Sequence, residues 1–370
     1  MRSFLSFSGY GGVELPVEVR RLDMTLVRRA LTSDALDLEP GDYVVLARFP
    51  DGQYAYRRVR AAQGQEQRIS FHDAPREPMS APAAQRARSR TLTLHIERSA
   101  NAAAIRLPDK DATRAQHRET HIACYAGNPL QGTCRVLRPE TVGEVSPRRR
   151  KERQMAYRLS RRGETRQLIL QVAQAGAAGV HLILPHDALK VQVWLHPTEP
   201  PQLHAHLPNK ALDTALQFLW HGDGETAAQL ALHHIASKPD LPRLVYLYAL
   251  LRTNALQQLG EWTEQLTSPQ YGADGAVIRS ECYARQGNPQ DSLRELLRLS
   301  SLGLPVFTEG FTLAINRLRL SIAASEGFPP EQREEAAALL QALSAFEPCV
   351  DYTQPFLTYT GRRPDAPAEP

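Results

Sequence analysis

The hydrophobic pattern of this chain changes its period near Pro208. Ahead of that residue, short apolar runs alternate with polar positions and end at turn-forming residues, which is typical of β-strands. After it, leucine and alanine recur at intervals of three and four residues, which places them on one face of an α-helix. The predicted fold class is multidomain α+β, with two β-sandwich-like domains followed by an α-helical hairpin array.

Residues 1–73 form the first predicted module, a small β-sandwich-like domain. Glu39-Pro40-Gly41-Asp42 has proline and glycine where a type II turn requires them, and Pro50-Asp51-Gly52 supplies a hairpin turn. Alternation of apolar residues predicts strands at 15–20, 24–29, 43–49, 54–60 and 67–71.

A linker and a second β-rich domain are predicted next. Residues 74–90 are rich in proline, alanine, serine and arginine without an apolar period, which indicates a linker. The second domain covers residues 91–197. Its predicted strands are 91–97, 121–125, 134–137, 166–173, 180–184 and 189–195, and a joint rich in proline and histidine follows at 198–208.

Residues 208–346 are predicted to be the helical array, and residues 347–370 a tail. Leu212, Ala215, Leu216 and Leu219 form the first apolar stripe, and Ala228, Ala231, Leu232 and Ile235 the second. Glycines separate the stripes, and Asn288-Pro289 has the sequence of a helix N-terminus. Within the tail, residues 352–359 are expected to add a strand or to strap back onto a neighbouring domain.

Two segments resemble known families. Residues 38–52, with their Pro-Gly-x-Tyr turn and strand, resemble the last strands of carboxypeptidase-regulatory-like β-sandwich modules, which implies a scaffold or binding platform without catalytic residues. Ala284-Arg-Gln-Gly287, followed by Ser292-Leu293, resembles the junction between helices of degenerate tetratricopeptide repeats. The Trp-x-x-Leu-Gly-x-x-Tyr core of those repeats is absent from this chain.

The net charge of +4 hides an asymmetry between the two parts of the chain. Residues 1–200 hold 31 cationic and 21 acidic residues, a balance of +10, whereas residues 201–370 hold 13 and 19, a balance of −6. Parts of opposite charge are suited to docking on each other or on a charged partner. The chain shows no secretory signal and no apolar run of membrane-spanning length, so we expect a cytoplasmic protein that does not enter membranes.

The densest group of metal-capable side chains is His117, His121 and Cys124. The two histidines share a face only in a helix, whereas the following residues favour a strand, so a polar loop is preferred to a metal site. A cysteine or metal-dependent hydrolase built from these residues stays an alternative. Cys124 and Cys134 flank a predicted hairpin, so they are either reduced thiols or a disulfide. No nucleotide-binding or serine hydrolase motif is present, and we expect no cofactor, no metal and no catalytic residue.

A basic cluster is the strongest local candidate for binding. It consists of Arg148, Arg149, Arg150, Lys151 and Arg153 and extends to Arg162. Such a cluster can neutralise phosphates of a nucleic acid or another polyanion. The alternatives are a solvated loop and a contact with the acidic helical part.

The helical array supplies a second candidate surface, because stacked hairpins can form a concave face for a peptide or partner helix. Most aromatic residues of the array are expected in its core, and Tyr246, Trp262 and Tyr283 are the predicted anchors for a partner.

The function predicted is that of a non-enzymatic adaptor or regulatory subunit. By analogy of architecture, its setting would be a bacterial multi-component regulatory or defence system, with a separate effector such as a caspase-like peptidase as the protein partner. Nucleic-acid binding through residues 148–162 is the first alternative. The sequence predicts no particular oligomeric state.

Overall fold

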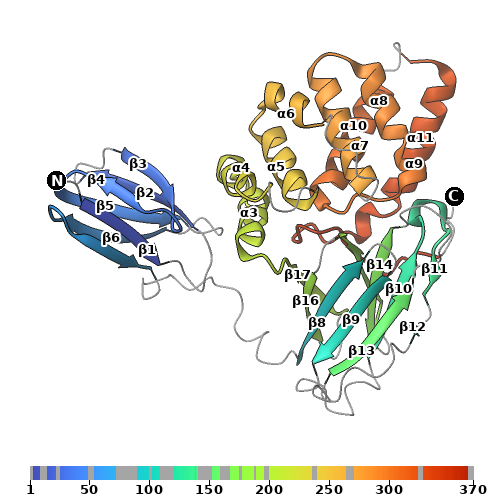
Figure 1. The fold of residues 1–370 in the computed structure, drawn as a ribbon. Helices are drawn as coiled ribbons and strands as arrows, with labels where there is room; N and C mark the ends of the chain where they lie inside the picture. The colour runs from blue at the N-terminus through green and yellow to red at the C-terminus, as the bar shows by residue number, and fades with distance from the viewer. Residues whose placement is uncertain are drawn as a thin grey trace. The chain divides into compact units, whose positions relative to one another are not determined.

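The structure is a computed structural model, shown in Figure 1. It describes residues 3–8, 15–21, 26–48, 54–71, 90–99, 102–108, 120–137, 139–140, 152–158, 167–174, 177–186, 189–195, 200–235, 240–263, 271–323 and 328–365. The N-terminal part is rich in strands and the C-terminal part is helical. By its internal contacts the chain forms two compact units, Met1–Ala81 with Asn209–Ser237 and Pro82–Pro208 with Lys238–Pro370. Most of the predicted linker, residues 74–89, lies outside the described residues.

The strands described in the first unit form two sheets. The four-stranded antiparallel sheet has the order β3-β2-β5-β6, and its strands are Leu26–Leu31, Pro16–Arg21, Gly41–Arg48 and Tyr54–Ala61. The three-stranded sheet has the order β4-β1-β7, with strands Leu36–Leu38, Ser3–Ser8 and Glu66–Ser70. Strand β1 pairs antiparallel with β4 and parallel with β7.

One buried apolar cluster draws on both of these sheets. Val17, Val19 and Val45 of the four-stranded sheet join Leu5 and Ile69 of the three-stranded sheet in it. Every second residue of a strand faces the same side, so the alternation that predicted β2, β5 and β6 reflects this core. Strands β1 and β4 were not predicted.

The second unit also contains two sheets. The five-stranded sheet has the order β11-β10-β14-β15-β18, with strands Arg135–Val136, Thr120–Ala126, Leu168–Gln174, Val180–Leu184 and Thr358–Thr360. The six-stranded sheet has the order β12-β13-β9-β8-β16-β17, with strands Pro139–Glu140, Glu152–Arg158, Ala102–Pro108, Arg90–Ser99, Leu189–Leu195 and Gln202–His206. All pairs in both sheets are antiparallel.

The predicted joint rich in proline and histidine at residues 198–208 contains a strand that was not predicted. Strand β17 lies in this segment and pairs with β16. Its Leu203 and Ala205 are buried, whereas His204 and His206 between and after them are half-buried, which is the alternation of an edge strand with one covered face. The surrounding prolines and histidines hid this short pattern.

Among the described residues, the first unit contains the helices α3 (Lys210–Trp220) and α4 (Gly224–Leu232). Asn209 caps α3 because its Oδ1 accepts hydrogen bonds from the N–H groups of Ala211 and Leu212. The predicted stripe of α3 is buried. The predicted stripe of α4 is buried only in part, since Ala231 and Ile235 are buried and Leu232 is 47% exposed, while Ala227 and Leu230 complete the buried face.

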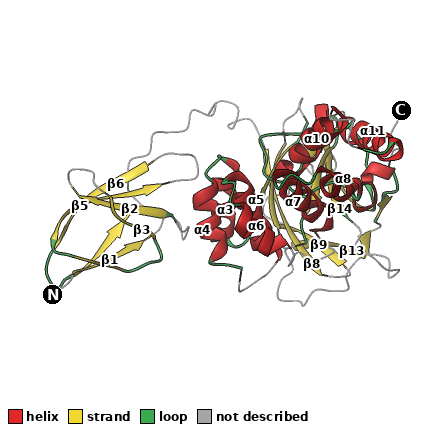
Figure 2. Cartoon of the chain, turned by 90° about the horizontal axis from the view of Figure 1, so that it is seen from above, coloured by secondary structure: helices red, strands yellow, loops and turns green. Residues whose placement is uncertain are grey.

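The helices of the second unit, in the part of the chain that is described, are α5 (Asp240–Arg252), α6 (Leu256–Thr263), α7 (Gly272–Arg285), α8 (Pro289–Leu297), α9 (Leu299–Leu302), α10 (Thr308–Ala323) and α11 (Pro330–Ser344). Consecutive helices contact each other in the pairs α5/α6, α7/α8 and α10/α11. As predicted, Asn288 caps α8, with Pro289 as its first residue. Figures 1 and 2 show these helices grouped beside the sheets of the same unit. None of the helices described is both long and apolar enough to cross a membrane.

The tail returns to the sheet, as predicted for residues 352–359. After a short 3-10 helix at Glu347–Cys349, strand β18 pairs with β15 at the edge of the five-stranded sheet. Phe356, Leu357 and Tyr359 have no exposed surface, so this segment is part of the core of the second unit.

Candidate partner-binding site

Helices α5 and α6 bring two of the predicted anchors together. Tyr246 of α5 and Trp262 of α6 meet edge to face, with ring centroids 5.6 Å apart. Tyr246 is only 6% exposed, whereas Trp262 is half-buried. The guanidinium of Arg243, one turn before Tyr246, lies 5.8 Å from the centre of the Trp262 ring. Trp262 is therefore held from two sides and keeps part of its surface in solvent.

The rigidity of this aromatic cluster comes from α5. This helix buries residues on all sides, and from Leu244 to Leu251 every side chain is buried. Gln258 of α6 accepts a hydrogen bond from the Tyr246 hydroxyl at 3.5 Å, and burial raises the pKa of that hydroxyl. Tyr246 is thus a support for Trp262 more than a contact surface of its own.

Tyr283 lies on α7, which contacts both α5 and α6. It is half-buried, and its carbonyl accepts hydrogen bonds from Gln286 and Asn288 at the end of the helix. Three other large aromatic residues of the array lie in its core, where most of them were expected. Tyr248, Tyr271 and Phe307 are core residues with at most 2% of their surface exposed.

A buried carboxyl group, which the sequence reasoning missed, joins three elements of the array. Asp274 of α7 accepts hydrogen bonds from the Tyr248 hydroxyl at 2.8 Å and from the N–H groups of Val306 and Phe307 at 2.8 and 3.3 Å. Burial raises the pKa of Asp274 to about 6, although these hydrogen bonds oppose the rise. In sequence, Asp274 looked like an ordinary acidic residue in the first turn of a helix.

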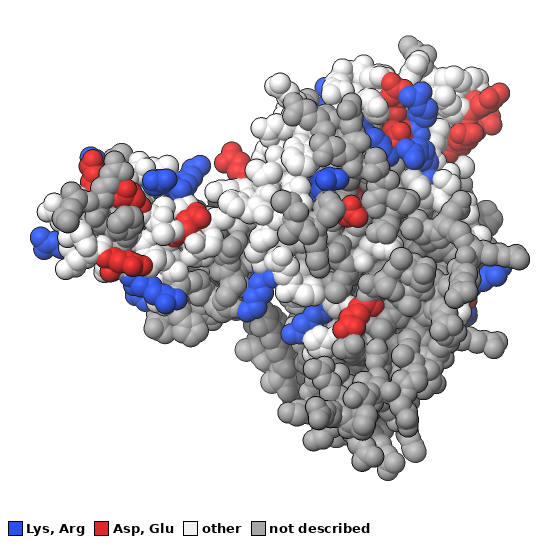
Figure 3. Space-filling model, in the orientation of Figure 1, with Lys and Arg blue, Asp and Glu red and all other residues white. Residues whose placement is uncertain are grey.

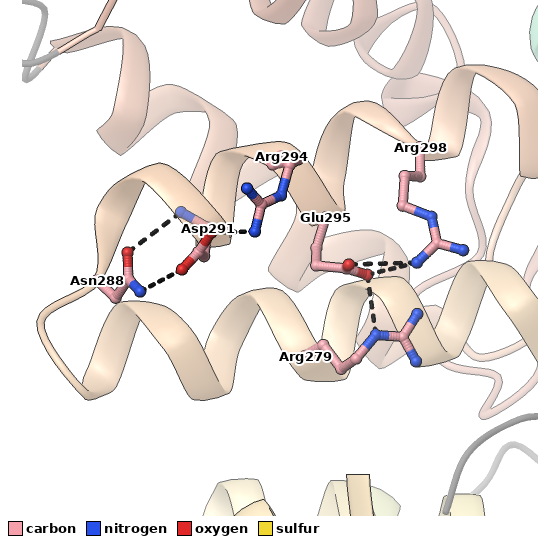
Figure 4. A network of polar contacts seen from close by, with 6 residues as sticks. All are labelled: Arg279, Asn288, Asp291, Arg294, Glu295 and Arg298. Carbon is pink, nitrogen blue, oxygen red and sulfur yellow. Dashed lines mark hydrogen bonds and ion pairs between the residues drawn. The ribbon is translucent and has the colours of Figure 1, made fainter. Parts of the chain in front are cut away.

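Ion pairs connect the helices near their surface. Figure 4 shows Glu295 of α8 accepting from Arg279 of α7 at 2.9 Å and from Arg298, while Asp291 binds Asn288 and Arg294. A second, less exposed group is centred on Glu281, which binds Arg317 of α10 at 2.8 Å and Arg285 at 3.3 Å. Over α8–α11, Figure 3 shows positive and negative side chains side by side. Their arrangement indicates a structural role.

Amide side chains fasten the helical array to the five-stranded sheet. Leu304 donates its N–H to Gln167 Oε1 at 3.1 Å, and Gln167 Nε2 donates back to the Leu304 carbonyl. The carbonyl of Ser300 accepts from Asn128 Nδ2 at 2.8 Å and from Gln131 Nε2 at 2.9 Å. The aromatic cluster therefore rests on a base that includes the sheet.

The structure describes little of the predicted basic cluster. Arg148, Arg149, Arg150 and Lys151 lie outside the described residues. The backbone of Arg153 belongs to β13, where it pairs with Leu107 of β9.

The two described members of the predicted His and Cys group, His121 and Cys124, do not lie together. His121 is exposed and Cys124 is fully buried in strand β10, three positions later, so they face opposite sides of the sheet. His117 lies outside the described residues. Across the described ranges, no three His, Cys, Asp or Glu side chains form a group that could hold a metal ion.

All four cysteines are free, and Cys124 and Cys134 form no disulfide. Burial raises the pKa of Cys134 to about 12 and also raises that of Cys282. These two thiols are therefore protonated near neutral pH and are poor nucleophiles.

A polar group on the five-stranded sheet surrounds His181. Tyr125 donates to Gln171 Oε1 at 3.0 Å, Gln171 Nε2 lies 3.0 Å from His181 Nε2, and the His181 ring stacks on Tyr359 of β18. Burial lowers the pKa of His181 to about 4, so the imidazole is neutral near pH 7. The group connects the tail to the sheet.

Part of the chain matches a known family. Residues 210–370 match a family model described as Y4kD C-terminal domain. The match begins at the first residue of α3 and extends through β18 and the rest of the tail. Its description names a domain and states no activity. A search of the curated proteins found no match to this chain.

Proposed function

We propose that this chain is a non-enzymatic adaptor or regulatory subunit that binds a protein partner through its helical part. The proposal rests on the environment of Trp262. This side chain is half-exposed and contacts Tyr246 and Arg243, both of which lie on the largely buried helix α5. Tryptophan, tyrosine and arginine are the residues that most often dominate the binding energy of protein interfaces. A side chain that is already immobilised also loses little entropy on binding.

The second anchor of the proposed surface is Tyr283. Its helix, α7, adjoins α5 and α6, so a partner segment lying across α6 and α7 would contact both Trp262 and Tyr283. The tetratricopeptide-like form of the array and the β-sandwich form of the sheets belong to this proposal, as does a setting in a bacterial regulatory or defence system. No cofactor takes part in it.

The test is capture of the full-length protein from its native cells, with nuclease and high salt as controls. We expect one stoichiometric protein partner that survives both treatments. Trp262→Ala should weaken its binding by about 2 kcal/mol, which is roughly 30-fold. Tyr352→Ala is the matched control, because Tyr352 is an aromatic residue of the same unit with 44% of its surface exposed.

The proposal fails if no protein is retained, or if Trp262→Ala and Tyr352→Ala reduce retention equally while both variants melt like the wild type. Recovery of material that nuclease and salt remove would favour nucleic-acid binding in place of an adaptor.

A further inference from the structure

The outer face of the sheet β3-β2-β5-β6 in the first unit carries arginines in a regular array. The inner face is occupied by the apolar core, so the residues between the core positions form the outer face. Those with described and at least partly exposed side chains are Pro16, Glu18, Arg20, Leu26, Arg29, Asp42, Val44, Arg58 and Arg60. Every cation in this set is an arginine.

Glu18 lies at the centre of the face and forms ion pairs with two of these arginines. Arg20 binds Glu18 through Nε at 2.9 Å, and Arg29 on the neighbouring strand approaches the same carboxylate at 3.3 Å. Two arginines thus share one carboxylate, and the Arg29 side chain remains 62% exposed. The carboxylate orients the two guanidinium groups and leaves one net positive charge among the three side chains.

Arg58 and Arg60 are the free cations of the array. Both are exposed on β6, which is an edge strand, and neither forms an ion pair with any residue in the described part of the chain. Asp42 lies opposite Arg60 in the register. Arg58 and Arg60 with Asp42 leave a net charge of +1, and Arg20 and Arg29 with Glu18 leave another +1.

The spacing of the arginines suits a chain of repeated negative charges. Arg58 and Arg60 are two residues apart, which is ~6.8 Å along an antiparallel strand. In the register, Val44 lies between Arg20 and Arg58, so these two arginines are two strand spacings apart, ~9.6 Å. A planar guanidinium group can bind two phosphate oxygens at once through two parallel N–H···O hydrogen bonds.

Apolar positions lie between these charges. Val44 is half-buried between Arg20 and Arg58, and Leu26, opposite Arg20 on the edge strand β3, is 41% exposed. A sheet that combines cations with accessible apolar positions suits a ligand with both phosphates and unstacked bases.

We propose that this face binds single-stranded nucleic acid, with Arg58, Arg60 and Arg29 contacting phosphates and the apolar positions contacting bases. The site is separate from the basic cluster at 148–162 and from the proposed partner surface on α6 and α7. An acidic peptide would use the charges but would have no use for the apolar positions between them.

The experiment measures binding of a fluorescent 20-nucleotide oligo-dT to the full-length protein by anisotropy at several salt concentrations. Arg58→Glu with Arg60→Glu should weaken binding roughly tenfold at low salt. Because two phosphate contacts are lost, the slope of log affinity against log salt should become shallower by about 1.4. Arg135→Glu with Arg333→Glu is the control, since both of these arginines are exposed on the second unit and the charge change is the same.

Arg58→Gln with Arg60→Gln repeats the test without charge reversal, in case the glutamate variant does not fold. The proposal is overturned if the wild type does not bind oligo-dT, or if the control pair at Arg135 and Arg333 loses as much affinity as the pair at Arg58 and Arg60. It is also overturned if polyglutamate or duplex DNA competes as well as oligo-dT does. Any of these results leaves the proposed adaptor function unaffected, because that proposal concerns the second unit.

Discussion

At Asp274, a carboxyl group without exposed surface receives hydrogen bonds from one hydroxyl and two backbone N–H groups. The N–H groups of Val306 and Phe307 stand just ahead of α10, where they have no partner within the helix. Asp274 satisfies them from α7, and Tyr248 adds a contact from α5. One side chain therefore fixes the relative positions of three helices.

The stability of the protein should depend on the protonation of Asp274. Its pKa is about 6 in the folded state and 3.8 in the unfolded reference, so the folded state binds the proton more tightly. The resulting stabilisation is complete below pH 3.8 and is lost as the pH rises through 6. We expect the free energy of unfolding of the wild type, relative to Asp274→Asn, to fall by about 3 kcal/mol between pH 3.5 and 7.

Denaturant unfolding at several pH values measures this difference. Comparison with Asp274→Asn cancels the contribution of His181, which has the opposite sign because its lowered pKa of about 4 costs stability as the pH falls below 6.5. Glu347→Gln, which removes a partly exposed partner of Arg319, is the control and should leave the difference nearly flat. If the difference in free energy of unfolding between the wild type and Asp274→Asn does not change with pH, the raised pKa of Asp274 is contradicted.

At the scale of elements, the glycines that follow α7 and α9 have different structural roles. Gly287 follows α7 with φ +79°, and Gly303 follows α9 with φ +93°. A Cβ at Gly287 would meet nothing within 4 Å, whereas one at Gly303 would lie 2.7 Å from Oε1 of Gln167. Gly287 only allows the backbone conformation that ends α7. Gly303 allows such a conformation after α9 and also leaves room for Gln167, which binds the array to the sheet.

We expect Gly287→Ala to cost about 1 kcal/mol, because only the backbone conformation is strained. Gly303→Ala should cost at least about 3 kcal/mol, because the new methyl group also displaces the amide of Gln167, which would break its paired hydrogen bonds with Leu304. Chemical denaturation of the two variants compares them directly. Equal losses would show that the contact with Gln167 is unimportant.

Most elements could be predicted from local pattern, whereas some of those that were missed, such as β1, are paired only with strands far along the chain. Strands β15 and β16 begin and end where predicted, because both are bounded by turn residues and rich in branched apolar side chains. Strand β1 has serines between its few apolar residues and is defined by pairing with β4 and β7, far along the chain. Its alternation of Leu5 and Phe7 with Ser6 and Ser8 covers only four residues, which is too short a pattern to predict a strand by itself.

At the scale of the whole molecule, the tail connects parts of the second unit that are far apart in sequence. The N–H of Leu357 donates to the carbonyl of Val306 at 2.8 Å, and the carbonyl of Leu357 accepts from Ile183 at 3.0 Å. Its neighbour Phe356 stacks on Phe307 with ring centroids 5.4 Å apart. A single tail residue thus binds the helical array on one side and the sheet on the other.

A chain that ends at Pro355 should therefore lose at least about 5 kcal/mol, since it lacks Phe356, Leu357 and Tyr359 and leaves the β15 edge unpaired. We expect its second unit to lose cooperative thermal unfolding, as followed by circular dichroism. A chain that ends at Asp365 is the control and should melt like the full-length protein. Normal melting of the shorter chain would show that the tail is dispensable.

The sequence by itself determined the change from strands to helices near Pro208, most of the apolar stripes and the cap of α8 at Asn288, because each of these depends on residues within a few positions of one another. Only the tertiary structure decided that Trp262 is held by Tyr246 and Arg243, that Asp274 joins three helices, and that the tail completes a sheet. These contacts join residues brought together by folding of the whole chain. Local periodicity reports which face of an element is buried, but it does not report which other element covers that face.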